Sequence, residues 1–466
     1  MNTFMPPSRN NPLLLAAVGG LTLLGILTYF FAFSENPTLM LGFILFLGMG
    51  VVMFLRPEYG LPALLIIRPI VDSIGEYRIA VGNASINVAG AMSMIAIIWA
   101  LWILARRRSK IWDRELFRSM LLFLVIGGAS FLYSWDRAAT VAELVRFSGF
   151  FLLFLVTREL VTDWAAFRRI VIAFIISLIV PTIVGYGQVL TGTGLTFADS
   201  TNRAFGTFGH PNVLAFYLVL GISFLILTWP LLSLRLRSRW PVIVVLSGLL
   251  LLTFTRGAWL GLLISLGMIG LVRYRRQLLG GLVGLVVLIA ILPTINIVTS
   301  SVFDLDLRAI PGAREIIARQ AEKSSYQWRL DVWEEMGRRV AERPLLGYGL
   351  GAFPQVRELQ VFDFFQGVGA HNDYLRLLVE TGYLGLLAYV AILFSIFVHL
   401  GRLYRRFGQH QLALPALGLI GFSLAFIFMS IFDNLLQATA VMWAFMILLG
   451  ATLNLTQKPP RVRRKI

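Results

Sequence analysis

Long apolar segments recur along the whole chain, separated by short polar stretches. Each is about as long as a helix that crosses a hydrocarbon core of roughly 30 Å. The pattern predicts an all-α, polytopic membrane protein with about 12–14 transmembrane helices. The segments at 59–71, 240–254 and 257–272 are the short ones. The candidate crossings are 13–33, 38–55, 59–71, 88–104, 116–133, 141–157, 168–190, 212–232, 240–254, 257–272, 277–295, 373–398, 412–431 and 436–455.

Composition agrees with a membrane protein, because 58% of the residues are hydrophobic and only 14% are charged. The chain has no cysteine, which excludes disulfides, thiol nucleophiles and thiolate metal sites. The first apolar segment, from Leu13 to Phe33, is longer than a signal-peptide core and lacks a small-residue cleavage site. It is expected to remain in the protein as a signal anchor.

The net charge of +17 would suggest a nucleic-acid partner in a soluble protein. Here the basic residues gather in short loops between apolar segments, as the positive-inside rule requires, so no nucleic acid is expected. With a cytoplasmic N-terminus, every dense basic cluster falls on the inner side, and both termini are cytoplasmic. These clusters are RRRSK (106–110), RLRSR (235–239), RYRR (273–276), RLYRR (402–406) and RVRRK (461–465).

The outer side then receives a loop at 191–211 and a long segment at 296–370, before the third-last crossing. This long segment carries nine Lys/Arg and ten Asp/Glu between Ser300 and Ala370, unlike the basic inner loops. Within this segment, apolar residues recur every four positions and would form one apolar stripe along a helix: Trp328, Val332, Met336 and Val340. This spacing predicts an amphipathic helix that ends at Pro344 and lies on the bundle or on the membrane surface. The glycine-rich stretch LLGYGLGAF follows and is expected to fold closely over a neighbour. The expected domains are 1–295 (N-terminal bundle), 296–370 (outer loop) and 371–466 (C-terminal helices and basic tail).

Arg256 stands in the middle of a long apolar stretch, in the sequence TFTRGAW. Residues 240–272 have basic clusters at both ends, so the chain must turn back at TRG and place Arg256 at the tip of a helical hairpin near the outer face. Two interpretations remain open: an arginine that snorkels to the interface, and an anion site that faces an outer cavity.

Arg203 and His210 belong to the outer loop, in the sequence NRAFGTFGHPN. A lone arginine in such a loop is often only solvated. His210 precedes Pro211 at a helix start and is interpreted as a capping or packing residue.

Near the end of the chain, His371 stands directly before a membrane helix, in AHNDYLRLLVETGYLG. Asn372 is a good N-cap, and a positive helix end favours the neutral imidazole, which can accept a proton. His371 is thus a candidate base, with capping or packing as the alternative. The charged residues that follow fall on one helix face and predict an internal ion ladder: Asp373, Arg376 and Glu380.

Asp433 and Asn434 lie at another outer helix end and are candidates either to contact an acceptor or simply to cap the helix. Outside the ladder there is no carboxylate pair, so neither a metal site nor a cofactor is expected.

These motifs resemble the O-antigen ligase and polymerase family of bacterial membrane glycosyltransferases. The similar pieces are NRAFGTFGHPN (202–212), TFTRGAW (253–259), RLDVWEEM with RPLLGYGLGAF (329–353) and AHNDYLRLLVETGYLG (370–385), within a similarity that spans roughly residues 116–455.

The resemblance implies glycan transfer at the outer face of the cytoplasmic (inner) membrane. The donor would be a glycan on undecaprenyl diphosphate, and the acceptor a hydroxyl of lipid A-core, of a growing polysaccharide or of a protein. His371 would be the catalytic base, and the expected substrate-binding residues are Arg203, Arg256, Asn372 and Asp433. Guanidinium donors suit the departing diphosphate, and transfer would be inverting and metal-independent.

Two other classes of function compete with a transferase. A transporter or flippase for an anionic or lipid-linked substrate would use the same arginines without chemistry, and paired inverted repeats or two broken helices would favour it. A structural scaffold would explain the crossings but not the outer histidine.

Overall fold

The computed structural model describes residues 48–72, 78–81, 84–107, 116–196, 202–232, 238–276, 325–358, 370–408 and 410–455. The expected crossings at 13–33 and 277–295, most of the one at 38–55, and both termini lie outside these residues. Each of the other eleven expected crossings coincides with a helix. Seven described helices are long and apolar enough to cross a membrane, and three shorter ones are also apolar. The predicted all-α, polytopic membrane fold is therefore confirmed.

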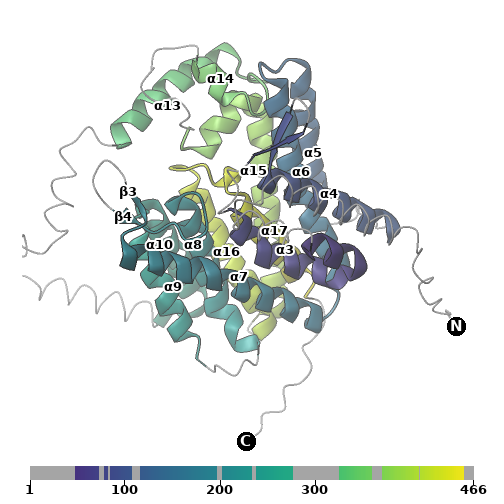
Figure 1. Ribbon diagram of the computed structural model, residues 1–466, viewed down its shortest axis with the longest axis vertical. Coiled ribbons are helices and arrows are strands. Elements are labelled where there is room, and N and C mark those ends of the chain that lie inside the picture. The colour runs from purple at the N-terminus through teal and green to yellow at the C-terminus, as the bar shows by residue number, and fades with distance from the viewer. Residues whose placement is uncertain are drawn as a thin grey trace, which may run out of the picture.

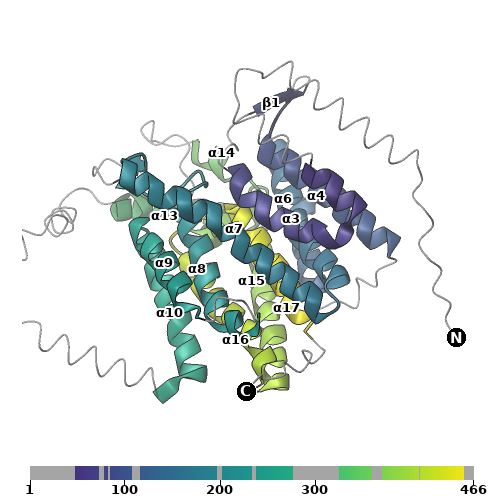
Figure 2. The same ribbon diagram turned by 60° about the horizontal axis from the view of Figure 1, so that its bottom comes forward.

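The described residues form the following bundle helices, given in chain order (Figures 1 and 2). They are α3 (Pro57–Val71), α4 (Val88–Arg106), α5 (Phe117–Ala129), α6 (Arg137–Leu160), α7 (Trp164–Thr191), α8 (Pro211–Thr228), α9 (Trp240–Leu252), α10 (Arg256–Arg273), α15 (Asp373–Phe407), α16 (Leu414–Met429) and α17 (Thr439–Leu453).

Two small antiparallel hairpins, which the sequence analysis did not predict, interrupt the helical pattern. One joins β1 (Arg78–Val81) to β2 (Ala84–Asn87). The other joins β3 (Leu195–Thr196) to β4 (Asn202–Arg203), where Leu195 pairs with Arg203. The second hairpin matters for the site, because Arg203 lies on its second strand, β4.

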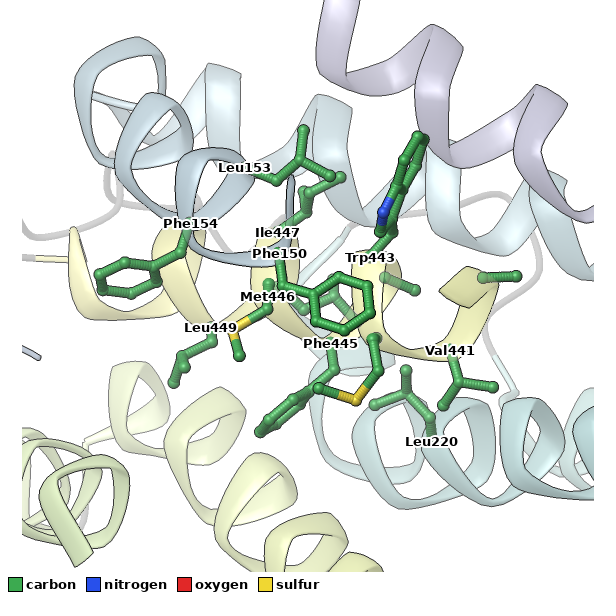
Figure 3. Packing of buried hydrophobic residues seen from close by; sticks show 14 of the residues in the cluster. Phe150, Leu153, Phe154, Leu220, Val441, Trp443, Phe445, Met446, Ile447 and Leu449 are labelled. Carbon is green, nitrogen blue, oxygen red and sulfur yellow. The ribbon is translucent and has the colours of Figure 1, made fainter. Parts of the chain in front are cut away.

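The core lies around α17, which is buried along nearly its whole length. Figure 3 shows Trp443 and Phe445 of this helix among side chains of α6 and α8, such as Phe150 and Leu220. A helix that is apolar all round must be surrounded by other helices, and α17 therefore forms the centre of the bundle.

Helix ends meet in two separate groups, as alternating crossings require. In one group, the Nδ2 of Asn454 at the end of α17 donates to the carbonyls of Arg158 and Val161 at the end of α6, both at 2.7 Å. In the other group, the backbone N–H of Ala204 donates to the carbonyl of Leu252 at 3.1 Å. The second group contains the ends that the sequence assigns to the outer side.

The predicted amphipathic helix is α13 (Ser325–Glu342), and a short helix, α14 (Phe353–Glu358), follows it. Both lie against the first turns of α15 (Figure 1). Three residues of the predicted stripe, Val332, Met336 and Val340, are buried in a cluster that includes Val379 of α15. The side chain of the fourth, Trp328, lies outside the described residues. The helix therefore packs on the bundle through the face that the spacing predicted.

The glycine-rich stretch folds closely over α15, as predicted. Its three alternate glycines have φ values of +67°, +111° and +84°; they are Gly347, Gly349 and Gly351. The N–H of Tyr348 donates to the carbonyl of Val379 at 3.0 Å, and the N–H of Gly349 to that of Glu380 at 2.8 Å. A residue with a side chain is unfavourable at such backbone angles. A side chain is also unfavourable where the backbone of this stretch lies so close to that of α15.

Replacing Gly349 with alanine is expected to destabilise the fold by about 1–3 kcal/mol. A Cβ atom there would lie 2.2 Å from Oγ of Ser134, and the backbone angle is unfavourable as well. Gly337 offers a matched control within α13, since a Cβ there meets nothing within 4 Å. Thermal unfolding of the purified variants would compare the two. Equal melting temperatures for Gly349→Ala and Gly337→Ala would contradict the prediction.

Helix α15 contains a break at Gly382 that the apolar pattern did not indicate; this residue has φ +61° and ψ −167°. The freed N–H groups beyond the break bond to the outer segment: that of Tyr383 donates to Pro344 O at 2.8 Å, and that of Leu384 to Leu345 O at 3.3 Å. The outer segment thus replaces the lost helical hydrogen bonds, and residues 373–381 form a separate half-helix.

Candidate active site

His371 occupies a strained position at the start of this half-helix. Its φ of +45° is rare for a residue with a side chain, and such strain concentrates at functional sites. Asn372 caps the helix as predicted, since its Oδ1 accepts from the N–H groups of Tyr374 and Leu375, both at 3.0 Å. The N–H of Asp373, the residue after this cap, donates to the carbonyl of Ser430 at 2.9 Å. These bonds fix the backbone from which the His371 side chain projects.

The His371 ring faces Asp433, with Nδ1 3.3 Å from Oδ1 of the carboxylate. Both side chains are largely buried, with 21% and 15% of their surface exposed. A carboxylate only accepts hydrogen bonds, so Nδ1 carries the proton that faces Asp433, and Nε2 is the candidate basic nitrogen of the ring. This is the arrangement that orients a histidine as a general base.

Asp433 is the centre of a polar network rather than a simple helix cap. Its Oδ1 also accepts from the N–H of Asn434 at 2.9 Å, and its Oδ2 accepts from Nδ2 of Asn212. Burial opposes ionisation, but the hydrogen bond and charge of His371, the Asn434 N–H and the charge of His210 together hold the pKa of Asp433 below its ordinary value. The carboxylate is therefore ionised at neutral pH.

Arg203 joins the same network through Asn212, which lies in the first turn of α8. Its Nη2 donates to Oδ1 of Asn212 and to Oγ1 of Thr255, both at 3.0 Å, and its Nε donates to Thr253 O at 2.7 Å. Thr255 in turn donates to Asn212 at 3.1 Å. Arg203 is thus held against the TRG turn instead of being merely solvated.

Arg256 begins α10 at the tip of the α9–α10 hairpin, as the sequence predicted. The turn before it contains Phe254, whose φ of +51° marks a second strained residue. The Arg256 side chain is exposed, while its neighbours Thr253 and Thr255 bond to Arg203. The two arginines therefore lie next to the same turn, residues 253–256.

His210 caps α8, in agreement with its interpretation as a capping residue: Nδ1 accepts from the N–H of Asn212 at 3.1 Å. Burial lowers the pKa of His210; Asp433 opposes the shift, whereas Arg203 and His371 add to it. These electrostatic interactions place His210 in the same cluster as Asp433, Arg203 and His371.

The predicted ion ladder forms and is larger than expected. Nη1 of Arg376 lies 3.8 Å from Glu380 and 3.5 Å from Glu143 of α6, and Nη2 lies 3.9 Å from Asp373. Arg146 pairs with Glu143 from the other side. The cluster joins the half-helix to α6 in the turns that follow His371.

Asn212 and Thr255 link parts of the site in a way that the sequence motifs did not indicate. Asn212 was visible as part of a helix start, but its partner Asp433 lies 221 residues away. Nothing in the local pattern indicates that contact. Among the described residues, no group of three or more His, Asp or Glu side chains is placed to hold a metal ion.

Part of this chain is similar to known proteins. An uncharacterized protein of Haemophilus influenzae is 26% identical over 153 residues, which is 31% of this chain and 38% of that relative. Residues 241–390 match the family model described as O-antigen ligase. The match includes the Arg256 hairpin, the glycine-rich stretch and the His371 half-helix, whereas Arg203 and Asp433 lie outside it. Through residues 241–390, the chain is therefore similar to the O-antigen ligase family.

Proposed function

We propose that the protein transfers a glycan from an undecaprenyl-diphosphate carrier to an acceptor hydroxyl at the outer face of the cytoplasmic membrane. The observation that carries the proposal is the continuous network His371–Asp433–Asn212–Arg203, which ends against the Arg256 hairpin. It joins a candidate basic nitrogen to the guanidinium group of Arg203 and to the turn before Arg256, and glycosyl transfer from a diphosphate needs both a base and cations. The match of residues 241–390 to the O-antigen ligase family supports a role in O-antigen and lipopolysaccharide assembly.

In the proposed reaction, the acceptor oxygen attacks the anomeric carbon of the donor sugar. Its proton passes to Nε2 of His371 while the bond between that carbon and the phosphate oxygen breaks. Asp433 stabilises the imidazolium that forms, because its carboxylate already accepts from Nδ1. A single displacement inverts the configuration at the anomeric carbon.

The arginines stabilise the leaving group in this proposal. Undecaprenyl diphosphate departs with growing negative charge, and planar guanidinium groups can donate to two phosphate oxygens at once. The bonds of Arg203 to Thr253 and Thr255 hold the hairpin in place, so Arg256 presents its side chain without reorganisation. Asn372 contributes by capping the helix that carries His371.

Purified protein in detergent is expected to consume a lipid-linked glycan and release undecaprenyl diphosphate when an acceptor is present. No ion gradient is needed, because the chemistry drives the reaction. Thin-layer chromatography of a radiolabelled donor would follow both species, with His371→Ala from the same preparation as the control. A protein that binds the donor but never consumes it would favour the transporter alternative.

The orientation in the membrane is part of the proposal. We expect both termini in the cytoplasm and residues 296–370 outside, since every dense basic cluster then lies inside. Reporter fusions that are active only in the periplasm should work at Ser300 and fail at Lys465. The reversed result would overturn the outer active site together with the topology.

A further inference from the structure

Two leucines of the outer segment are exposed, although the sequence assigns this segment to the aqueous side. Leu345 and Leu346 begin the glycine-rich stretch, and they are 62% and 49% exposed. The apolar stripe of α13 does not cover them, because that stripe is itself buried against α15. Adjacent large apolar side chains on a surface indicate contact with another molecule or with a membrane.

The backbone of this turn lies at the outer end of an exposed apolar stripe on α15. The carbonyl of Leu345 accepts from the N–H of Leu384 at 3.3 Å, and a Cβ atom at Gly382 would lie 2.3 Å from the same carbonyl oxygen. Beyond the break, exposed side chains recur along one face of the helix: Tyr383, Leu387, Val390 and Phe394. On a helix that crosses a membrane, such a face is in contact with lipid.

Helix α5 carries a second stripe that ends at the same turn. This helix packs alongside α15. Its exposed side chains include Leu122 and Val125, and Leu132, just beyond its end, is 77% exposed. The hydroxyl of the next residue, Tyr133, donates to the carbonyl of Leu346 at 2.9 Å. The two leucines therefore lie where the exposed stripes of two neighbouring membrane helices end.

The length of α15 indicates the depth of the turn. Between Tyr383 and Arg402, the first residue of a basic cluster, the helix spans roughly 28 Å, which is close to the thickness of a hydrocarbon core. Tyr383 is then at one boundary of the hydrocarbon when the basic cluster is at the other. Aromatic residues are typical of this depth, and Trp135, which is 41% exposed, lies beside the turn with the guanidinium of Arg343 over its ring at 5.7 Å.

We propose that Leu345 and Leu346 insert among the acyl chains of the outer leaflet and anchor the outer segment to the membrane. Their surface continues the lipid-facing stripes of α5 and α15, and this continuity favours lipid over a second protein as the occupant. The inference does not depend on glycan transfer and takes only the choice of leaflet from the proposed orientation. The same turn bonds to the half-helix through the N–H groups of Tyr348 and Gly349, so the anchor holds the candidate site at the bilayer surface.

The full-length protein allows a direct test, because the chain has no cysteine and one introduced cysteine can carry an environment-sensitive fluorophore. Leu345→Cys and Leu346→Cys would each be labelled with NBD in phosphatidylcholine and phosphatidylglycerol nanodiscs. Lipids with a nitroxide near the headgroup or near the end of the acyl chain measure depth, and iodide measures contact with water. We expect the nitroxide near the headgroup to quench both labels severalfold more than the other nitroxide, with little quenching by iodide.

Two labelled positions serve as controls. Leu387→Cys, on the exposed stripe of α15, should be quenched by the deeper nitroxide, and Arg338→Cys, 68% exposed on α13, by iodide alone. Labels at 345 and 346 that behave like the label at 338 would place the turn in water and overturn the proposal. Labels that neither lipid nor iodide reaches would reveal a protein contact and overturn it too. Absence of lipid quenching at 387 would remove the stripe, and the proposal with it.

Discussion

His371→Ala is expected to abolish glycan transfer, with a loss of about 10²–10⁴-fold or more, while donor binding stays near the wild-type level. A base for the acceptor hydroxyl acts in the chemical step and contributes little to the affinity for the donor diphosphate. The structure sharpens this expectation, because Nδ1 already bonds to Asp433 and leaves Nε2 as the basic nitrogen. Single-turnover transfer and equilibrium donor binding, measured on the same preparation, would separate the two steps.

His410 provides a matched control for this experiment. It also precedes a helix and accepts a backbone N–H, that of Leu412 at 3.2 Å, but it lies beyond the other end of α15. His410→Ala should therefore keep transfer activity. Asp433→Asn should resemble His371→Ala, since an amide no longer fixes the proton on Nδ1. Near-normal transfer by His371→Ala would contradict the role as base and favour the alternative, a histidine that only caps or packs.

Arg256→Lys is expected to be impaired nearly as badly as Arg256→Ala, with about 10–100-fold less transfer in each. Lysine keeps the charge but loses the planar fork that bonds two phosphate oxygens at once. An arginine that only snorkels to the interface would be replaced by lysine without loss, because a flexible cation reaches water equally well. One substitution at constant charge therefore distinguishes the two interpretations.

Transfer in membranes, normalised to protein level, would measure the effect. Arg273 lies at the opposite end of α10, so Arg273→Lys and Arg273→Ala serve as controls that should retain activity. Full activity in Arg256→Lys would remove Arg256 from the diphosphate site. Substitution of Arg203 is a less direct test of diphosphate binding, because its three hydrogen bonds also hold the α9–α10 hairpin in place.

Several features of this protein follow from local sequence alone. Apolar segments set the positions of the helices, because a chain in hydrocarbon must satisfy its backbone hydrogen bonds within each helix. The cap at Asn372, the buried stripe of α13 and the close approach of Gly349 were also predictable. Each depends on residues within a few positions of one another, where backbone geometry fixes which side chains meet.

The candidate site was only partly predictable, and the tertiary structure decided the rest. Sequence motifs pointed to His371, Arg203 and Arg256 separately. Only packing brings Asp433 to His371, 62 residues away, and Asn212 to Asp433, 221 residues away. The break at Gly382 likewise depends on the outer segment, whose carbonyls accept the freed N–H groups. Contacts of this kind arise where helix ends from distant parts of the chain meet, and no local periodicity encodes which ends those are.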